Sequence, residues 1–329
     1  MRTKAGTSKE SISQKRFSEY KIPYFGINHQ NIWEEKLNIL NKEIENFSFE
    51  NSIQFGILTR IRQSILQEAI EGKLTANWRQ DNPIRKGDPE YDGAALLKKI
   101  KAEKQKMIGE GKIRKEKPIA PIKPDDVPFA LPEGWVWTRL GETGNLKRGK
   151  SKHRPRNDVM LFKNGTYPFI QTGNVSDAKF NKDLIVSTNN FYNEFGLKQS
   201  EMQKKGTLCI TIAANIAECG FLNFDACIPD SIVCFASINR VIDKYVYYFI
   251  KTAKANLEKF APATAQKNIN LGILGILPIP LPPLAEQRVI VDKVEKLFTM
   301  VDALELQTKE RKEQAERLVR AVLREAFEK

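Results

Sequence analysis

The hydrophobic pattern of the chain is most regular over about its last fifty residues. From Ala285 onward, apolar side chains recur at alternating intervals of four and three residues, at Ile290, Val294, Leu297, Val301 and Leu304. This spacing is the a/d stripe of a coiled coil, so it predicts a long helix that needs a partner helix along its apolar face. The preceding residues 279–284 contain three prolines, which fix φ and lack an N–H donor, and they predict an extended segment.

The same pattern occurs near the N-terminus, 257 residues earlier. Both copies are interrupted by two polar positions at the same place, Asn51 and Gln54 in the first and Thr308 and Arg311 in the second. Two unrelated amphipathic helices are the alternative, but a register shared over about fifty residues, defects included, favours a diverged repeat. The stripe positions of the first copy are Trp33, Leu37, Leu40, Ile44, Phe47, Asn51, Gln54, Leu58, Ile61 and Ile65.

The segment between the two predicted helices has the pattern of a globular domain. Four short apolar runs bounded by turn-forming residues predict strands at 135–140, 167–171, 208–213 and 231–236. Residues 244–255 have the spacing of an amphipathic helix. We therefore predict an α+β fold, in which one mixed α/β domain is bracketed by two long antiparallel coiled-coil helices.

Residues that join the first long helix to this domain carry their own signals. Gly72 is expected to end the helix, and Asp92 to cap a short helix that stops near Gly109 or Gly111. Residues 98–123 contain ten Lys or Arg and three Glu, and prolines recur just after them. This composition predicts a semi-extended, solvated tether that does not pack, and a strap facing phosphates is the alternative.

Charge narrows the class of partner. The 329 residues include 53 Lys or Arg and 40 Asp or Glu, so the formal charge is +13, which favours a polyanionic partner. Cys209, Cys219, Cys227 and Cys234 lie among apolar residues without C-x-x-C spacing, which predicts buried thiols rather than metal ligands or disulfides. Neither a secretory signal nor an apolar run that could cross a membrane is found, so we expect a cytoplasmic location.

Motifs for catalysis or cofactor binding are missing from the sequence. It contains no G-x-G-x-x-G, P-loop, H-E-x-x-H or G-x-S-x-G pattern. Pro229-Asp230 could suggest a nuclease, but no acidic-x-Lys element follows it closely. We therefore expect a protein that recognises a polyanion, with no catalytic residue, metal or cofactor of its own.

Two sets of residues suggest how a nucleic acid is recognised. The first is the basic loop (residues 147–156), whose six Lys or Arg are unopposed by any acid. Lys and Arg contact phosphates, and Arg also forms a fork to guanine O6 and N7. The second set is two polar turns, at 171–174 and 265–270, whose Asn and Gln suit adenine edges, although turn formation alone also explains them. The predicted DNA-binding residues are Lys147, Arg148, Lys150, Ser151, Lys152, Arg154, Arg156, Gln171, Thr172, Asn174, Gln266, Lys267 and Asn268.

Four motifs together resemble one family. Residues 277–287 (LPIPLPPLAEQ) with the following helix, and 64–74 (SILQEAIEGKL), are similar to the conserved regions of type I restriction-modification specificity subunits. Residues 131–135 (LPEGW) and 266–269 (QKNI) resemble the start and end of their target recognition domain. The resemblance implies a non-catalytic subunit in which each such domain binds one half of a bipartite double-stranded DNA site. It also implies that the helices dock methyltransferase subunits, which bind S-adenosylmethionine, and that an ATP-driven restriction subunit joins them.

On this basis the chain divides into five parts. We expect a disordered tail at 1–21, the first conserved helix at 22–74 and a basic helix with a Pro-rich tether at 75–130. The target recognition domain is expected at 131–278, and the second conserved helix at 279–329.

The chain differs from the usual family pattern of two recognition domains alternating with two conserved helices. About twenty residues stand where another recognition domain would precede the first helix. Two copies associating through the long helices would restore a bipartite site, and use of a different subunit's recognition domain is the alternative. A coiled-coil scaffold with a basic domain that binds RNA or protein is the competing function.

Overall fold

The computed structural model describes residues 18–19, 26–114, 118–259 and 269–328. Their contacts divide the chain into two compact units. Unit 1 comprises Met1–Arg60 with Val301–Lys329, and unit 2 comprises Ile61–Met300. Each long helix therefore contributes one part to each unit.

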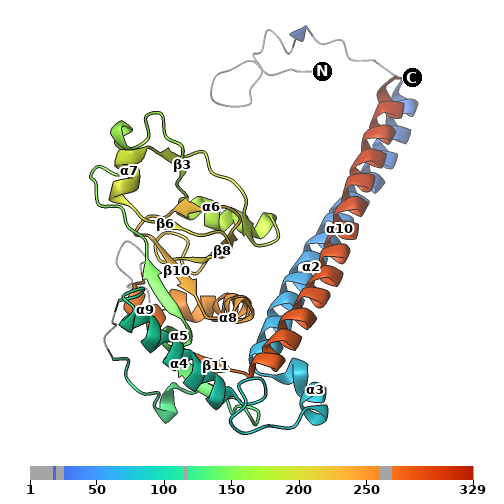
Figure 1. Ribbon diagram of the computed structural model, residues 1–329. Helices are drawn as coiled ribbons and strands as arrows, with labels where there is room; N and C mark the ends of the chain where they lie inside the picture. The colour runs from blue at the N-terminus through green and yellow to red at the C-terminus, as the bar shows by residue number, and fades with distance from the viewer. Residues whose placement is uncertain (1–17, 20–25, 115–117, 260–268, 329) are drawn as a thin grey trace. The chain divides into compact units, whose positions relative to one another are not determined.

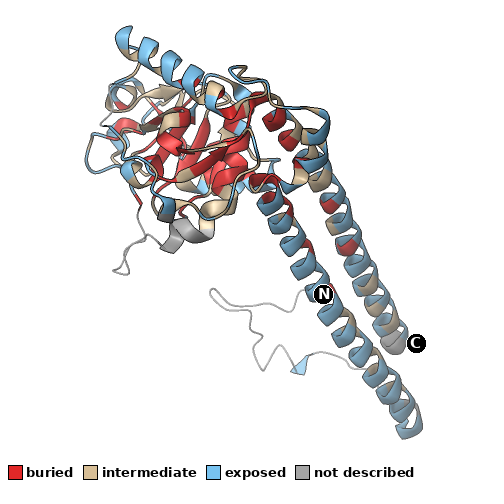
Figure 2. Ribbon diagram, turned by 90° about the horizontal axis from the view of Figure 1, so that it is seen from below, coloured by how far each residue is buried: buried red, intermediate tan, exposed pale blue. Residues whose placement is uncertain are grey.

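Unit 1 is built from parts of two long helices, α2 (Ile27–Ile70) and α10 (Leu284–Glu328). They lie side by side with opposite chain directions (Figures 1 and 2). Within the unit, Leu58 and Val301 are buried at stripe positions, and so are the polar Asn51 and Thr308. The long antiparallel helices predicted from the stripes are confirmed. The polar interruptions differ, because Gln54 and Arg311 are exposed.

The end of the first long helix lies in unit 2. Gly72 has φ 74°, a left-handed conformation that glycine adopts without strain, and it leads into η1 (Lys73–Thr75) and α3 (Ala76–Asp81). The carboxylate of Asp92 then accepts hydrogen bonds from Ala94 N and Ala95 N at the start of α4 (Gly93–Gly109). The predicted helix stop and the predicted cap are both confirmed.

A five-stranded mixed sheet forms the centre of unit 2. Its order is β2-β10-β7-β8-β4, with antiparallel neighbours except for the parallel pair β4 and β8. The strands of this sheet are β2 (Asn145–Arg148), β4 (Leu184–Ile185), β7 (Leu208–Thr211), β8 (Cys219–Leu222) and β10 (Ile232–Ala236). Buried residues concentrate on these strands and on the helices that cover them (Figure 2).

Three further strand pairs are antiparallel. They join β1 (Val136–Arg139) to β11 (Pro278–Leu281), β3 (Tyr167–Pro168) to β5 (Phe191–Tyr192), and β6 (Met202–Gln203) to β9 (Ala226–Cys227). The remaining helices are η2 (Pro124–Asp126), α5 (Leu140–Thr143), η3 (Val159–Leu161), α6 (Thr172–Asp177), η4 (Ala178–Phe180), α7 (Glu194–Gln199), α8 (Arg240–Lys259) and α9 (Leu271–Gly275).

Helix α8 connects the sheet to the second conserved segment. It lies against β8, where the rings of Tyr247 and Phe221 are 5.4 Å apart between centroids. The hydroxyl of Tyr245 donates a 2.8 Å hydrogen bond to the carbonyl oxygen of Pro280 in β11. The proline-punctuated run is therefore a strand that pairs with β1, an arrangement that needs no N–H from its prolines at the free edge.

The tether prediction was wrong in one respect. The guanidinium of Arg139 donates to the carbonyl oxygens of Ala120 and Pro121 and forms a 2.6 Å ion pair with Asp126. The carbonyl oxygens of Ala120 and Pro121 have no hydrogen-bond partner in a described helix or strand, so they accept hydrogen bonds from the nearly buried Arg139. These bonds hold the Pro-rich stretch against the globular domain. The stretch is thus packed and not a free, solvated tether.

The cysteines agree with the sequence analysis. All four are buried and free. Burial raises the pKa of the Cys219 thiol to about 12. In the described part of the chain, no helix is both long and apolar enough to cross a membrane.

Candidate nucleic-acid interface

The basic loop (residues 147–156) is fixed by its backbone to neighbouring turns. Gly149 N donates to the carbonyl oxygen of Ile232, Lys150 N to that of Ile228, and Lys152 N to that of Gln199. A Cβ at Gly149 would overlap the Pro229 carbonyl oxygen, so only glycine permits this close approach. The loop therefore presents its side chains from a defined backbone.

The first two cations of the segment lie in a strand. Lys147 and Arg148 belong to β2, which pairs with β10, so the prediction that the whole segment is a loop was wrong for them. Side chains on successive strand residues point to opposite faces, which separates the two. Lys147 is half-buried, whereas Arg148 is exposed.

One carboxylate, that of Glu201, holds two lysines of the segment. Lys147 Nζ pairs with its Oε1, and Lys150 Nζ lies 2.5 Å from its Oε2. Burial raises the pKa of Glu201, but the hydrogen bonds from Lys147 and Lys150 outweigh it, so the net shift is downward. Glu201 thus remains ionised and cancels part of the charge of the basic loop.

Asp230 gathers the arginines in the same way. Its Oδ2 lies 2.6 Å from Nη2 of Arg156 and 3.5 Å from Nη2 of Arg154. Arg148 Nε donates a 2.6 Å hydrogen bond to the main-chain oxygen of Asp230. Three guanidinium groups are therefore held around one residue of the turn between β9 and β10.

The other side chains of the segment differ in whether they have a bonding partner in the described part of the chain. Lys152 is exposed, and its ammonium has no acceptor among the described residues. Ser151 is 7% exposed, and its hydrogen bond partly offsets the burial that raises the pKa of Tyr192. His153 bonds Asp158 across 2.7 Å. Arg148 and Lys152 are thus the cations of this segment that no carboxylate of the described chain holds.

The first predicted polar turn starts α6. The backbone N–H of Gln171 donates to Asn174 Oδ1, and Asn174 Nδ2 donates to the Ser187 carbonyl oxygen. The side chain of Asn174 is therefore used in local structure, as the turn interpretation proposed. Gln171 is exposed, and Thr172 is partly exposed.

The second polar turn lies at the edge of what is described. Gln266, Lys267 and Asn268 lie outside the described residues. The next residue, Ile269, donates from its N–H to the Ile212 carbonyl oxygen at the end of β7.

Sequence reasoning missed three polar residues near these elements. Asn215, in the turn between β7 and β8, donates to the hydroxyl of Ser176 in α6. Two alanines of the same turn, Ala214 and Ala217, have φ of 62° and 59°, which is strained for residues with a Cβ. Glu201 and Asp230 are the other two. Asp230 was considered only as a possible nuclease residue, and the pairing of either acid has no local signal, because their cationic partners are distant in sequence.

A second cluster of charge joins the first helix end, the domain and the second helix. We call Thr75, Arg79, Trp135 and Glu286 the junction cluster. Glu286 is 1% exposed, and its carboxylate accepts from Arg79 Nη1 at 2.5 Å, Thr75 Oγ1 at 2.6 Å and Trp135 Nε1 at 2.7 Å. Arg79 also donates to the Gly72 carbonyl oxygen. All donors to this buried carboxylate come from other segments, so it ties them together.

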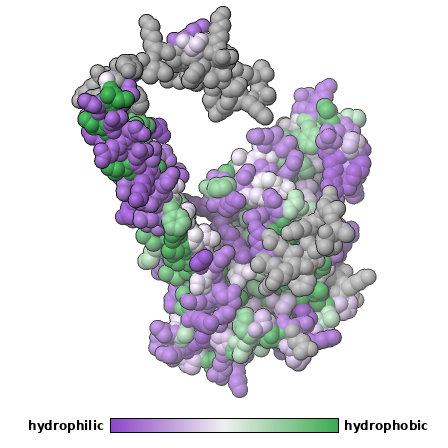
Figure 3. All heavy atoms as spheres, turned by 180° about the vertical axis from the view of Figure 1, so that it is seen from behind, coloured by the Kyte–Doolittle hydropathy of each residue, from purple (hydrophilic) through white to green (hydrophobic). Residues whose placement is uncertain are grey.

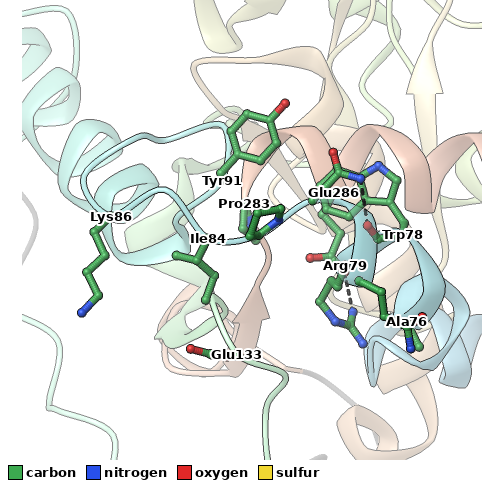
Figure 4. A pocket seen from close by; sticks show the side chains of 12 residues that line it. Ala76, Trp78, Arg79, Ile84, Lys86, Tyr91, Glu133, Pro283 and Glu286 are labelled. Carbon is green, nitrogen blue, oxygen red and sulfur yellow. Dashed lines mark hydrogen bonds and ion pairs between the residues drawn. The ribbon is translucent and has the colours of Figure 1, made fainter.

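A cavity of about 600 Å³ adjoins the junction cluster (Figure 4). Trp78, Tyr91 and Pro283 line it together with Arg79 and Glu286. The rings of Trp78 and Tyr91 are stacked with 6.4 Å between centroids, and Arg85 lies over Tyr91. In the described residues, no group of three or more His, Cys, Asp or Glu could hold a metal ion. Of the lining residues, Arg79 and Glu286 bond each other.

Comparison with known proteins gives one consistent result. A family model described as "Type I restriction modification DNA specificity domain" matches residues 132–316, more than half of the chain. The type I restriction enzyme EcoAI specificity subunit of Escherichia coli is 27% identical over 261 residues, which cover 74% of this chain and 40% of that protein. The EcoEI specificity subunit of Escherichia coli is 28% identical, with 74% of this chain and 41% of that protein covered. The chain thus spans about two-fifths of the length of these relatives.

Solved structures also align with the chain. The crystal structure of the HsdS subunit from Thermoanaerobacter tengcongensis aligns with a TM-score of 0.46 at 21% identity, covering 98% of this chain and 64% of that one. A type I system described for its complex assembly and conformational transition aligns with a TM-score of 0.47 at 21% identity, covering 83% of this chain and 58% of that one.

Proposed function

Because the chain belongs to the type I restriction modification DNA specificity domain family, we propose that it is a non-catalytic subunit that recognises one half of a bipartite double-stranded DNA site. In this proposal, residues 131–278 form the target recognition domain. Residues 22–74 and 279–329 are the conserved helices, 75–130 connects the first of them to the domain, and 1–21 is a tail.

The observation that carries the proposal is the basic loop. Exposed cations on a backbone held by three main-chain hydrogen bonds suit contact with the regular spacing of phosphates. We assign phosphate contact to Lys152 and Arg148, and assign the remaining proposed DNA contacts to Gln171, Thr172 and the 266–268 turn. The other predicted residues are Asn174, Ser151 and the four cations that pair with carboxylates, Lys147, Lys150, Arg154 and Arg156. In this proposal they position the contacting side chains, or they contact DNA after their present bonds break.

Protein partners are proposed for the long helices. The part of α2 in unit 1 carries exposed apolar side chains at Ile32, Ile39, Ile53 and Ile57, outside the stripe that faces α10. They are spaced to lie along one side of the helix, and an exposed apolar line of this kind suits another helix. Apolar residues also reach the surface of the helices among hydrophilic ones (Figure 3). We propose that methyltransferase subunits, which bind S-adenosylmethionine, dock here, and that a restriction and translocase subunit joins through them.

A second copy of the chain would supply the other half-site. Two-fold association through the long helices would force the two half-sites to be inverted repeats. The buried polar positions Asn51 and Thr308 would set the helix register, as polar residues do in other coiled coils. A different subunit's recognition domain is the alternative source of the second half-site. Both versions act on DNA in the cytoplasm.

Methylation mapping tests these proposals together. Cells that carry a type I methyltransferase with this chain should methylate an interrupted motif that cells with the methyltransferase alone do not. A palindromic motif supports two copies of this chain, and an asymmetric motif supports a different second domain. If no motif depends on the chain, the specificity function is wrong. Binding to RNA or to a protein through the basic domain would then be the better explanation.

A further inference from the structure

Two acidic residues outside the basic loop hold most of its charge. Glu201 lies between α7 and β6, and Asp230 lies between β9 and β10. Glu201 pairs with Lys147 and Lys150, and Asp230 pairs with Arg154 and Arg156. Four of the six cations of the segment therefore have a carboxylate partner from another element.

These ion pairs are exposed enough for the cations to exchange their carboxylate partners for other anions. Arg154 and Arg156 are 55% and 51% exposed, and the two lysines are 41% and 42% exposed. Ion pairs at such exposure contribute little to stability, because water and salt screen them. Their arrangement is therefore poorly explained as a device that stabilises the fold.

The side chain of Asp230 has a feature that is unfavourable for folding. Its Oδ1 is buried and has no hydrogen-bond partner within the described part of the chain. A buried carboxylate oxygen without a donor is unfavourable for folding. The main-chain oxygen of Asp230 also accepts a hydrogen bond from Arg148. An acid at this position is therefore better explained by a role in setting the charge and position of the arginines than by a role in stability.

We propose that Glu201 and Asp230 determine how strongly the basic loop discriminates between DNA sequences, by occupying four of its cations and leaving Arg148 and Lys152 for the phosphates. This inference rests on the proposed DNA-binding function and names residues that control it. Affinity for phosphates is independent of sequence, and it grows with the number of cations that neutralise them. Two internal carboxylates that compete with phosphates for four cations lower this nonspecific affinity. Asp230 also holds the guanidinium groups of Arg154 and Arg156 in place for contact with base edges.

The experiment measures the salt dependence of binding by the full purified chain. Two duplexes of equal length are titrated between 50 and 200 mM salt, one carrying the motif obtained by methylation mapping and one with the same bases in scrambled order. The variants are Glu201→Gln and Asp230→Asn, which keep size and remove one negative charge. The controls are Glu295→Gln, whose parent residue pairs with Lys244, and Asp225→Asn, whose parent residue pairs with Lys204. Each control makes the same chemical change away from the basic loop.

For Glu201→Gln and Asp230→Asn we expect tighter binding to the scrambled duplex and a steeper salt dependence. Each additional phosphate contact should steepen the slope of log affinity against log salt by about 0.9. Two freed cations would then increase the loss of affinity between 50 and 200 mM about tenfold. The ratio of affinities for the two duplexes should fall, because nonspecific binding rises more than specific binding. The two control variants should follow the parent chain.

Three other results have distinct meanings. If the parent chain shows no salt-dependent binding to either duplex, the proposed function fails and this inference fails with it. If the parent chain binds but Glu201→Gln and Asp230→Asn match their controls, the inference alone is wrong. If these variants bind both duplexes more weakly with an unchanged slope, the two acids have only a structural role, and the inference is likewise overturned.

Discussion

The junction cluster and the basic loop both place cations on carboxylates, but they do so at opposite degrees of burial. Glu286 is 1% exposed and receives hydrogen bonds from Arg79, Thr75 and Trp135. Glu201 is about one-third exposed, and each of its oxygens serves one lysine that is itself open to solvent. A buried charge is destabilising unless several donors satisfy it, whereas an exposed charge can lose its partner at little cost. The same chemistry therefore fixes the structure at one place and remains exchangeable at the other.

The largest expected effect is the loss of the junction carboxylate. Glu286→Ala leaves Arg79 and Trp135 Nε1 without their buried acceptor, and removing one member of a buried pair costs about 3–5 kcal/mol. Equilibrium unfolding in urea, followed by tryptophan fluorescence, measures this change, because Trp135 belongs to the cluster.

The control for that variant is an exposed ion pair made by Arg288, which lies on the same helix as Glu286. Glu90→Ala breaks the ion pair with Arg288, whose side chains are 40% and 48% exposed. An exposed pair contributes about 0–1 kcal/mol, so the midpoint should hardly move. Equal effects of Glu286→Ala and Glu90→Ala would contradict the assignment of the junction cluster as a structural centre.

A smaller effect is expected when the charge at the junction is kept and its geometry is lost. Arg79 donates to Glu286, Thr75 and the Gly72 carbonyl oxygen from two nitrogens of one planar group. Lysine has a single ammonium and cannot reproduce this fork. Arg79→Lys should lower the free energy of unfolding by roughly 1.5–3 kcal/mol, the range for hydrogen bonds to charged groups. An unchanged urea midpoint would show that only the charge of Arg79 matters.

The smallest effect on stability is expected for a change at Glu201, the exposed carboxylate. Glu201→Gln should change the free energy of unfolding at neutral pH by less than about 1 kcal/mol, because both its pairs are screened by solvent. The pKa of Glu201 in the folded chain lies below its ordinary value of 4.5. Its stabilising contribution is therefore present above pH 4.5 and disappears as the pH falls through the lower folded value.

Urea midpoints measured from pH 7 down to pH 3 for the parent chain and Glu201→Gln test this assignment. The small difference between them should vanish at the acid end. A difference that grew as the pH fell would contradict the assigned direction of the shift. Glu201→Gln is also expected to change DNA binding, as described above. Measuring both properties in this variant separates the effect of Glu201 on stability from its effect on discrimination between DNA sequences.

Elements with strong local periodicity were predicted well, and elements that depend on a partner were not. The stripes of α2 and α10 repeat over dozens of residues, and Gly72 and Asp92 act through bonds within a few residues. By contrast, β4, β6 and β9 each contain two residues, too few for a pattern. Their conformation follows from pairing with β8 or with each other, and pairing is a property of the folded chain.

The sequence by itself determined that this protein has two matched long helices around one α+β domain, and that six cations gather in ten residues of that domain. It did so because heptad spacing and composition are local properties. Only the tertiary structure decided which of those cations remain unpaired. Glu201 lies 51 and 54 positions from its lysines, and Asp230 lies 74 positions from Arg156. Coulomb attraction and hydrogen bonding act over a few ångströms in space, so these acids reach the basic loop only after folding has brought β2, β6, β9 and β10 together.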